Sequence, residues 1–443
     1  MGSLSPSGLI VANNPDLKKE LTVRPVKNAI GIQPPSFKVW RSSGEEMVIP
    51  RYFGRERFGP PATDTRSTPR GANIVFNGTL RSETHQDRAF ERGVKAFSEL
   101  GGGVLSLPPG YGKTAMALAF AAHLKVRTII IVHKEFLANQ WKERINQFCP
   151  GATVGRIQED TFDVEKDFVV AMIQTLCMRQ VGSLDDFGFV IVDEAHHIGA
   201  AAFSQTMFKL CPRYTLGLTA TPERKDGLTR LLYWFMGPEF YRTERLNQGK
   251  TRVITLNFKH DMYSEEPPTT RFGKVNMAEM CNRISDLNSR RELIINTVKE
   301  CIQANRKILV LCDRRELCTW INSQFDSKIS GLYMGLMKEK DLDETSRKQV
   351  IVATFAMAQE GLDIPALDTC ILASPRSDVT QAVGRIMRET TGKVNSPLIY
   401  DIVDHWGMLF AMYRKRKAFY KTSGFEFKED EPPQKKLKAC AFI

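Results

Sequence analysis

Short apolar runs alternate with longer amphipathic stretches in two parts of this 443-residue chain. Between residues 84 and 240 the apolar runs are "GVLSL", "TIIIVH", "FVVAMI", "FVIVD" and "TLGLTA". From about residue 281 they are "KILVLCD", "VIVATF", "TCILAS" and "LIYDIV". Short apolar strands separated by helical stretches are typical of a parallel, doubly wound sheet. The pattern therefore predicts an α/β protein with two tandem parallel-sheet lobes.

The segments outside these two parts lack the alternation. Residues 1–80 are rich in Pro, Ser and Asn, with short apolar strings such as "LTVRPV", and could hold a small β module. Residues 246–280 include "EEPP" and few apolar runs, which indicates a connector or an insertion. The charged, Pro-containing segment 426–443 is typical of a disordered tail. The two lobes are then expected to span residues 81–245 and 281–425.

Composition limits the classes of function. The net charge of +12 and the pI near 9.2 favour a polyanionic partner, although a basic surface can also serve solubility alone. The nine cysteines are scattered without C-x-x-C spacing, which indicates reduced thiols in an intracellular protein and neither a zinc site nor a disulfide framework. No apolar run reaches the roughly 18–20 residues of a membrane span, so we expect no membrane contact.

The stretch "LPPGYGKTAMALAF", residues 107–120, carries the strongest sign of chemistry. It joins a strand to a run of helix-forming residues, so amide groups at the helix start would face an anion. Gly110 and Gly112 allow the backbone to wrap a phosphate, Lys113 would reach its outer oxygens, and Thr114 would ligate Mg²⁺. The alternative is a Gly-Pro turn with a chance lysine. The candidate nucleotide-binding residues here are Leu107, Pro108, Pro109, Gly110, Tyr111, Gly112, Lys113 and Thr114, and Leu107 stands where the full pattern has a small residue.

Two neighbouring acids follow a later apolar strand in "FVIVDEAHHIG". Asp193 can hold Mg²⁺, usually through water, and Glu194 can orient and deprotonate an attacking water. Adjacent acids repel each other and lose hydration when buried, so a plain acidic turn is the weaker interpretation. His196 would lie between the nucleotide and the element that senses it. In "GLTATPERKDGL", Thr219 and Thr221 could hydrogen-bond to this acidic motif, or simply cap a strand end.

A basic segment in the second lobe, "QAVGRIMR", places Arg385 and Arg388 three residues apart, on one face if it is helical. If the phosphate loop and the acidic motif hydrolyse ATP, a charge from the second lobe would stabilise the transition state, and such an arginine accelerates hydrolysis by roughly 10³ to 10⁵. The alternative is an ordinary basic helix face.

These motifs, in this order, resemble those of a superfamily-two helicase. G-x-G-K-T, D-E-A-H and T-A-T are similar to its first RecA-like lobe, and Q-x-x-G-R-x-x-R is similar to its final motif. The string "GLTATPERKDGL" resembles the branch of XPB-type DNA translocases and their relatives in large DNA viruses. The resemblance covers residues 84–420. It implies two RecA-like lobes of the P-loop NTPase fold, and a DEAH-box ATP hydrolase that uses ATP and Mg²⁺.

The resemblance also implies further site residues. Gln86 stands where the superfamily often has an adenine-reading glutamine. In "ATFAMAQEGLDIPALDTCILAS", Gly361 would permit close backbone approach and Asp363 could accept a ribose hydroxyl. Gln381 joins the two threonines of the T-A-T motif as a residue that couples ATP to movement. The candidate nucleic-acid contacts, each of which could instead be a solvated helix start or strand end, are His133, Lys134, Gln174 and Thr175.

The polymer is inferred from the same resemblance. Helicase lobes grip the sugar–phosphate backbone, so sequence preference should be weak. "ERKDG" and "QAVGR" are closer to DNA translocases than to D-E-A-D RNA proteins, and "VIPRYFGRERFGPP" is similar to a segment of helicases of large cytoplasmic DNA viruses. The transcript-release helicase of poxviruses is the nearest functional model.

This implies an ATP-dependent DNA helicase or translocase in viral transcription. RNA polymerase or transcription factors are its candidate partners, and the host cytoplasm or the virion is its location. The alternatives are an ATP-dependent RNA helicase, and an ATPase-fold scaffold within a transcription complex.

Overall fold

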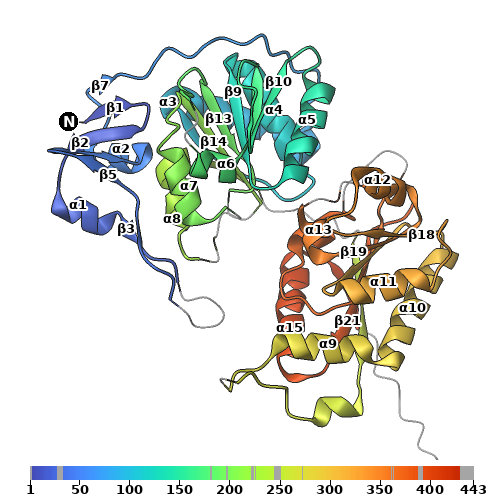
Figure 1. Cartoon of the computed structure of the whole chain (residues 1–443). Helices are drawn as coiled ribbons and strands as arrows, with labels where there is room; N and C mark the ends of the chain where they lie inside the picture. Colours follow the sequence, from blue (N-terminus) through green and yellow to red (C-terminus); the bar gives the residue numbers. More distant parts are fainter. Residues whose placement is uncertain are drawn as a thin grey trace, which may run out of the picture. The chain divides into compact units, whose positions relative to one another are not determined.

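The protein is represented by a computed structural model of the whole chain (Figure 1). It forms two compact units, Met1–Glu244 and Arg245–Ile443, and each is described by itself below. The structure describes residues 2–26, 33–179, 182–195, 198–220, 224, 226–243, 251–271, 273–360, 362, 364–387 and 393–429. No helix in these ranges is both long and apolar enough to span a membrane.

The first unit begins with a small sheet, which together with its helices we call the N-terminal module (described residues 2–26 and 33–64). The sheet has the order β5-β6-β2-β1-β7, and a separate pair is formed by β3 and β4. The strands are β1 (Ser3–Ser5), β2 (Gly8–Ala12), β3 (Thr22–Val23), β4 (Phe37–Lys38), β5 (Arg41–Ser43), β6 (Glu46–Ile49) and β7 (Thr63–Asp64), and the helices are α1 (Pro15–Glu20) and α2 (Arg51–Phe58). Leu9, Ile49 and Phe53 share one core with the neighbouring lobe, where the Phe53 ring meets Trp234 edge-on at 4.9 Å. The module therefore packs onto the lobe.

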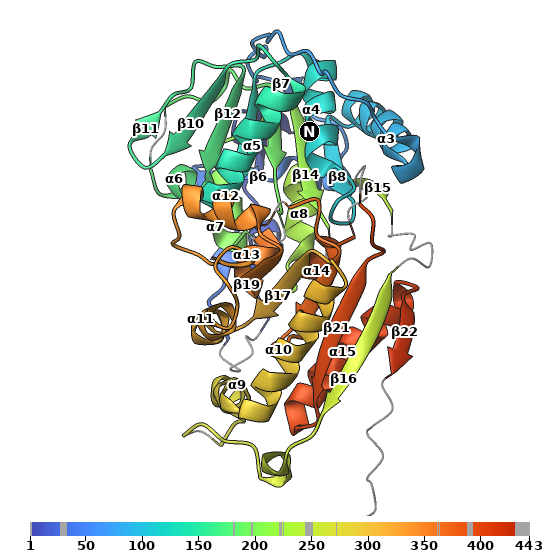
Figure 2. The same cartoon turned by 90° about the vertical axis from the view of Figure 1, so that its right-hand side faces the viewer.

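The lobe of the first unit contains an eight-stranded sheet with the order β11-β10-β12-β9-β13-β14-β8-β15 (Figure 2). All pairings are parallel except β10 with β11. Strands β8, β9 and β13 are buried at every residue, as expected where helices cover both faces of a parallel sheet. The strands are β8 (Gly102–Ser106), β9 (Thr128–Val132), β10 (Val154–Gln158), β11 (Thr161–Phe162), β12 (Phe168–Met172), β13 (Phe189–Val192), β14 (Tyr214–Thr219) and β15 (Glu239–Arg242).

Helices on the two faces of this sheet build two separate cores. Phe97, Phe120 and Trp141, from α3, α4 and α5, pack on one face, and Phe203 and Leu232, from α7 and α8, pack on the other. The helical elements are η1 (Ser82–Thr84), α3 (Gln86–Glu99), α4 (Lys113–Leu124), α5 (Glu135–Phe148), α6 (Ile173–Met178), α7 (Ala200–Met207) and α8 (Thr229–Met236).

The second unit contains a seven-stranded, entirely parallel sheet with the order β18-β19-β17-β20-β21-β16-β22. Its strands are β16 (Arg252–Phe258), β17 (Ile308–Cys312), β18 (Ser330–Tyr333), β19 (Val350–Thr354), β20 (Thr369–Leu372), β21 (Leu398–Asp404) and β22 (Glu426–Glu429). Its helical elements are η2 (Asp261–Ser264), α9 (Met277–Asp286), α10 (Asn288–Gln303), α11 (Arg315–Ser323), α12 (Glu339–Arg347), α13 (Phe355–Glu360), α14 (Thr380–Gly384) and α15 (Gly407–Thr422). The predicted α/β fold with two parallel-sheet lobes is confirmed.

Two strands of the second sheet lie where the sequence indicated no regular structure. Strand β16 falls in the expected connector, residues 246–280, yet it pairs with β21 over seven residues and with β22 on its other side. Strand β22 falls at the start of the expected tail. Both strands are only partly buried, with polar residues between the apolar ones, so they lack the continuous apolar run by which the other strands stand out. Residues 430–443 lie outside the described part of the chain.

Candidate functional site

The loop between β8 and α4 carries the residues predicted to bind phosphate. It is closed by backbone hydrogen bonds, since the amide of Leu107 donates to the carbonyl of Thr219 (3.0 Å) and the amide of Tyr111 donates to that of Pro108 (3.2 Å). The side chain of Leu107 is 1% exposed and belongs to the core under α4. Because this side chain points into the core, the large residue at position 107 does not fill the loop.

Glycine is required at two positions of the loop. Gly110 and Gly112 have φ angles of +86° and +78°, in the left-handed region that other residues rarely adopt. A Cβ atom at Gly112 would also lie 2.6 Å from Nε2 of Gln86. That Nε2 donates to the carbonyl of Tyr111 (2.9 Å), and the side-chain oxygen of Gln86 accepts from the amide of Arg81 (2.9 Å). Gln86, the first residue of α3, thus lies directly against the loop and is 2% exposed.

Lys113 begins α4 and reaches back across the loop. Its Nζ donates to the carbonyl of Leu107 (3.0 Å) and lies 4.0 Å from Oε1 of Glu194. The first amide groups of an α-helix have no acceptor within the helix, and Thr114 stands in this first turn. The parallel register puts the ends of β8, β14 and β13 side by side, so the loop and the acidic motif occupy the same edge of the sheet.

Asp193 follows β13 directly and is a buried carboxylate. Its Oδ2 accepts from the indole nitrogen of Trp141 (2.8 Å), and its Oδ1 accepts from the amide of Glu194 (2.9 Å). Burial and the charge of Glu194 raise its pKa to about 6, against the opposing effects of the Trp141 hydrogen bond and the charge of Lys113. The ion pair at this loop joins Lys113 to Glu194, so Asp193 has no ion pair with another described residue.

Glu194 has a φ of +46°, which is unfavourable for any residue with a Cβ atom. Hydrogen bonds hold the backbone amides of the residues on both sides of it. The amide of Asp193 donates to the carbonyl of Ile131 (3.0 Å), and the amide of Ala195 donates to that of Leu218 (3.2 Å). The carboxylate that faces Lys113 is therefore fixed by the two strands that flank β13.

Two residues near the acids were not identified from the sequence. Trp141, in α5, donates to Asp193, and no local pattern shows that an indole lies over a strand end. Arg224 donates from Nη1 to the carbonyl of Ala195 (3.0 Å) and binds Asp226 through its other nitrogens. The string "ERKDG", which contains Arg224, contributed to the family resemblance as a sequence motif. The hydrogen bonds of Arg224 could not be predicted from it, because they depend on the fold.

The structure describes only some of the residues that were predicted to couple ATP hydrolysis to movement. Thr219 is the fully buried last residue of β14, and its carbonyl accepts from the loop amide of Leu107. In the second unit, Gln381 lies in α14, and Nε of Arg385 donates to the carbonyl of Ala358 (2.9 Å). Five predicted site residues lie outside the described part of the chain: His196, Thr221, Gly361, Asp363 and Arg388.

The four candidate nucleic-acid residues lie together after strands β9 and β12. The side-chain amide of Gln174 donates to the carbonyl of His133 (2.9 Å), which joins the two strand ends. Lys134 precedes α5, and its partial burial lowers its pKa. Thr175 is mostly buried, and its hydroxyl accepts from the amide of Glu159 (3.0 Å). His133, Lys134 and Gln174 are the more accessible members of this group.

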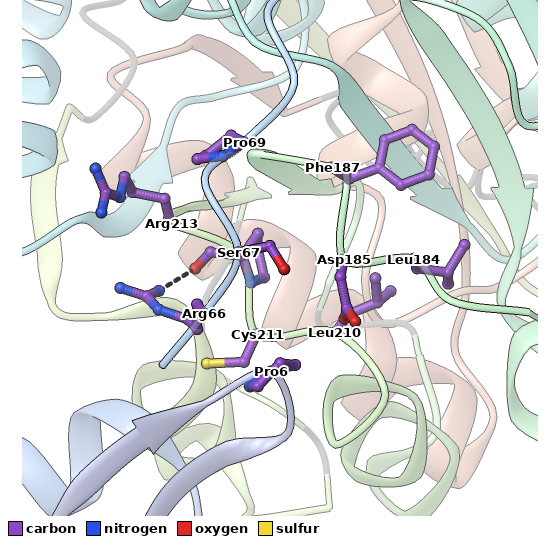
Figure 3. Close-up of a pocket in the computed structure, with 11 residues that line it drawn as sticks. Pro6, Arg66, Ser67, Pro69, Leu184, Asp185, Phe187, Leu210, Cys211 and Arg213 are labelled. Carbon is purple, nitrogen blue, oxygen red and sulfur yellow. Dashed lines mark hydrogen bonds between the residues drawn. The ribbon is translucent and has the colours of Figure 1, made fainter. Parts of the chain in front are cut away.

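The cavity in Figure 3 lies elsewhere in the first unit. It is lined by the segments that lead into β13 and β14, including Phe187 and Cys211, and by Arg66 and Pro69. Because Asp193 follows the opposite end of β13, this cavity is at the other edge of the sheet. It includes none of the predicted site residues.

Comparison with known proteins identifies the family. The family described as "Type III restriction enzyme, res subunit" matches residues 79–224. A protein of Acanthamoeba polyphaga mimivirus, provisionally named an ATP-dependent RNA helicase, is 32% identical over 407 residues, which cover 88% of this chain and 78% of that protein. The chain is a superfamily-two helicase. Membership implies that the protein uses ATP, typically with Mg²⁺.

Another viral protein supports the same family, and one solved structure supports the fold. A protein of invertebrate iridescent virus 6, provisionally named a helicase, is 28% identical to this helicase over 354 residues, covering 72% of this chain and 76% of that protein. A DNA-bound, ATP-dependent Type ISP restriction-modification enzyme has a similar fold, with a TM-score of 0.54 and 16% identity over 81% of this chain and 32% of that one. The helicase therefore shares its fold with this restriction-modification enzyme.

Proposed function

We propose that this helicase hydrolyses ATP at the loop between β8 and α4 and uses the reaction to move along DNA. The observation that supports this best is the geometry of three side chains at one sheet edge. Lys113 Nζ lies 4.0 Å from the Glu194 carboxylate, and Asp193 beside it is buried without an ion pair to a described residue. A cation, a general base and a metal ligand are the groups that phosphoryl transfer to water requires.

The residues present fit ATP and Mg²⁺. Gly110 and Gly112 adopt left-handed φ angles of +86° and +78°, so the backbone of the loop can curve closely around a phosphate. Asp193 is a buried carboxylate whose pKa is raised by burial and by the charge of Glu194, so a bound cation would favour its ionised form. When bound, Mg²⁺ would neutralise the phosphates and favour their displacement by water. Thr114 and Asp193 are the residues proposed to hold it, and Mg²⁺ commonly takes one or two protein oxygens in addition to phosphates and waters.

Each residue then has a definite task. Lys113 would exchange its hydrogen bond to Leu107 for a phosphate oxygen, and the helix start would supply free amides. Glu194 would orient and deprotonate the attacking water. Gln86 would read the adenine, and Arg385 and Arg388 would stabilise the charge of the transition state. Thr219, Thr221, His196 and Gln381 would link these events to movement, and Gly361 and Asp363 would complete the nucleotide contacts.

DNA is the proposed polymer because the motifs resemble DNA translocases and the net charge of +12 suits a polyanion. His133, Lys134, Gln174 and Thr175 are the proposed backbone contacts. RNA is the second candidate, because the mimivirus relative and those of African swine fever virus carry the name of ATP-dependent RNA helicases.

A role in viral transcription, with RNA polymerase or transcription factors as partners and the host cytoplasm or the virion as location, is proposed from the resemblance to poxvirus transcript-release helicases. The relatives from mimivirus and iridescent virus support a viral origin of the family. A scaffold without activity is the less favoured alternative, because Lys113 and Glu194 are both in place and face each other.

The test is steady-state ATP hydrolysis with no polymer, single-stranded DNA, duplex DNA and RNA, for the wild type and Lys113→Ala. Lys95→Ala is the matched control, since Lys95 is an exposed lysine of α3 whose ion pair with Glu99 is also exposed. We expect DNA to stimulate hydrolysis in the wild type and in Lys95→Ala, and Lys113→Ala to lose it. Stimulation by RNA alone would favour the second candidate, and hydrolysis by Lys113→Ala at the wild-type rate would contradict the proposed site.

A further inference from the structure

Arg224 is a buried guanidinium that joins the acidic motif to a neighbouring loop. Its Nε and Nη2 donate to the two carboxylate oxygens of Asp226 (3.0 and 2.6 Å), and its Nη1 donates to the carbonyl of Ala195 (3.0 Å). The side chain of Arg224 is 5% exposed. A planar guanidinium can bind a carboxylate through two nitrogens and keep a third for another acceptor, whereas an ammonium has no such fixed geometry.

Asp226 is itself held firmly, so it can fix the arginine. Its Oδ1 accepts from the amide of Leu228 (3.0 Å), and its carbonyl accepts from the amide of Val26, in the N-terminal module (3.0 Å). The amide of Arg224 donates in turn to the hydroxyl of Thr229, the first residue of α8 (2.9 Å). The arginine is thus anchored to the module, to α8 and to its own loop.

The carbonyl that Arg224 holds belongs to the residue after Glu194. Glu194 has a left-handed backbone, and such a conformation persists only where its surroundings enforce it. The amide of Ala195 is held by the sheet through Leu218, and its carbonyl is held by Arg224. Ala195 is thus held through both of its backbone polar groups, and loss of the arginine would release its carbonyl and loosen the backbone next to Glu194.

We propose that Arg224 is a positioning residue of the ATPase site, which acts by holding the carbonyl of Ala195, the residue after Glu194, so that the Glu194 carboxylate keeps its orientation toward the attacking water. This inference rests on the proposed function, in which Glu194 is the general base. It assigns to the "ERKDG" segment a role in hydrolysis rather than in nucleotide binding.

The chain contains a matched control for this arrangement. Arg66 donates from Nε and Nη2 to the two carboxylate oxygens of Asp64 (2.9 and 2.7 Å), and from Nη1 to the carbonyl of Pro212 (2.6 Å). This last bond is the dashed line in Figure 3. Arg66 is also nearly buried, at 9% exposure. It lies near the start of β14, so its removal deletes the same kind of bonds at the opposite sheet edge from Glu194.

The experiment compares the full-length wild type with Arg224→Ala, Arg224→Lys and Arg66→Ala. It measures kcat and KM for ATP at a saturating concentration of the nucleic acid that stimulates hydrolysis. We expect Arg224→Ala to lower kcat about 10- to 100-fold with KM within about twofold of the wild type, as is typical for loss of a residue that orients a catalytic group. Arg224→Lys should recover part of kcat, and Arg66→Ala should keep the wild-type kcat.

The split between kcat and KM separates positioning from a general loss of structure. An equal loss of kcat in Arg66→Ala, or a kcat of Arg224→Ala equal to that of the wild type, would overturn the inference. A rise in KM with unchanged kcat would overturn it too. If Arg224→Ala does not fold, Arg224→Lys carries the comparison. A wild type that hydrolyses no ATP with any polymer would contradict the proposed function instead, so the two failures are distinguishable.

Discussion

Asp193 in the first unit and Asp404 in the second are both buried carboxylates at the end of a central parallel strand, but they have different partners. Asp404 accepts from Nε and Nη2 of Arg290 (2.8 and 2.9 Å) and from the hydroxyl of Tyr263 (2.7 Å). Asp193 accepts from a neutral indole and from a backbone amide. The charge of Asp404 is paired with that of Arg290, whereas Asp193 forms no ion pair with any residue that the structure describes.

An acid that is paired within the fold serves stability, whereas an acid without an ion pair is available for a cation that binds from outside. A buried ion pair needs good geometry and further hydrogen bonds to offset its lost hydration, and the pair of Arg290 with Asp404 has both. Nearby, Arg416 binds Asp401 in the same way, with the hydroxyl of Tyr420 as an additional donor. A buried acid without such a partner destabilises the fold, and a cation that arrives from outside can relieve this cost.

The largest expected effect is on the stability of the second unit. Asp404→Asn leaves the buried guanidinium of Arg290 without its counter-charge, and should lower the free energy of unfolding by about 3–5 kcal/mol. The control is Asp286→Asn, because Asp286 pairs with Arg291 in the same unit but is 75% exposed, so its loss should change stability by about 0–1 kcal/mol. Denaturant unfolding followed by tryptophan fluorescence measures both. Equal losses of stability in the two variants would contradict the claim that the ion pair of Asp404 with Arg290 stabilises the fold.

A smaller effect of the opposite sign is expected at Asp193. Its pKa in the folded protein is about 6, above the ordinary 3.8, so the folded state binds this proton more tightly than the unfolded state does. Stability should therefore fall as the pH rises from about 4 to about 6, and the penalty should be complete above pH 6. Asp193→Asn removes the ionisable group and should stabilise the first unit at pH 8, on the order of 1–3 kcal/mol.

Denaturation at several pH values measures this gain, and fluorescence of Trp141, which donates to Asp193, reports on the relevant unit. The difference between the variant and the wild type should shrink as the pH falls toward 4 and disappear below about pH 3, where the wild-type carboxyl is protonated in both states. A variant that is less stable than the wild type at pH 8 would show that Asp193 serves the fold in the same way as Asp404.

The fold and the family could be predicted from the sequence because they depend on local patterns. Continuous apolar strands such as "FVIVD" indicated the parallel sheets, which the structure confirms, and the ordered motifs indicated a superfamily-two helicase, which the relatives confirm. Strand β16 was missed because polar residues interrupt it, so that its place in the sheet depends on β21 and β22.

The contacts within the site could not be predicted in the same way. Trp141 is 52 positions from Asp193, and only the packing of α5 on the sheet brings the two together. Arg224 and Ala195 are 29 positions apart and meet where two loops approach each other. The contacts of such residues depend on tertiary structure. The glycines and the lysine of the phosphate loop could be recognised from the sequence, because a short motif already indicates the backbone geometry and the charge that the site needs. The roles of the predicted site residues remain predictions.

We propose that Asp193, which forms no ion pair with a described residue, holds Mg²⁺ beside ATP. The most direct test is the Kd of ATP, measured calorimetrically with Mg²⁺ and with EDTA, for the wild type and Asp193→Asn. The account predicts that Mg²⁺ tightens ATP binding by about tenfold or more in the wild type, and that this gain is lost in the variant. A variant that keeps the full effect of Mg²⁺ would contradict the claim.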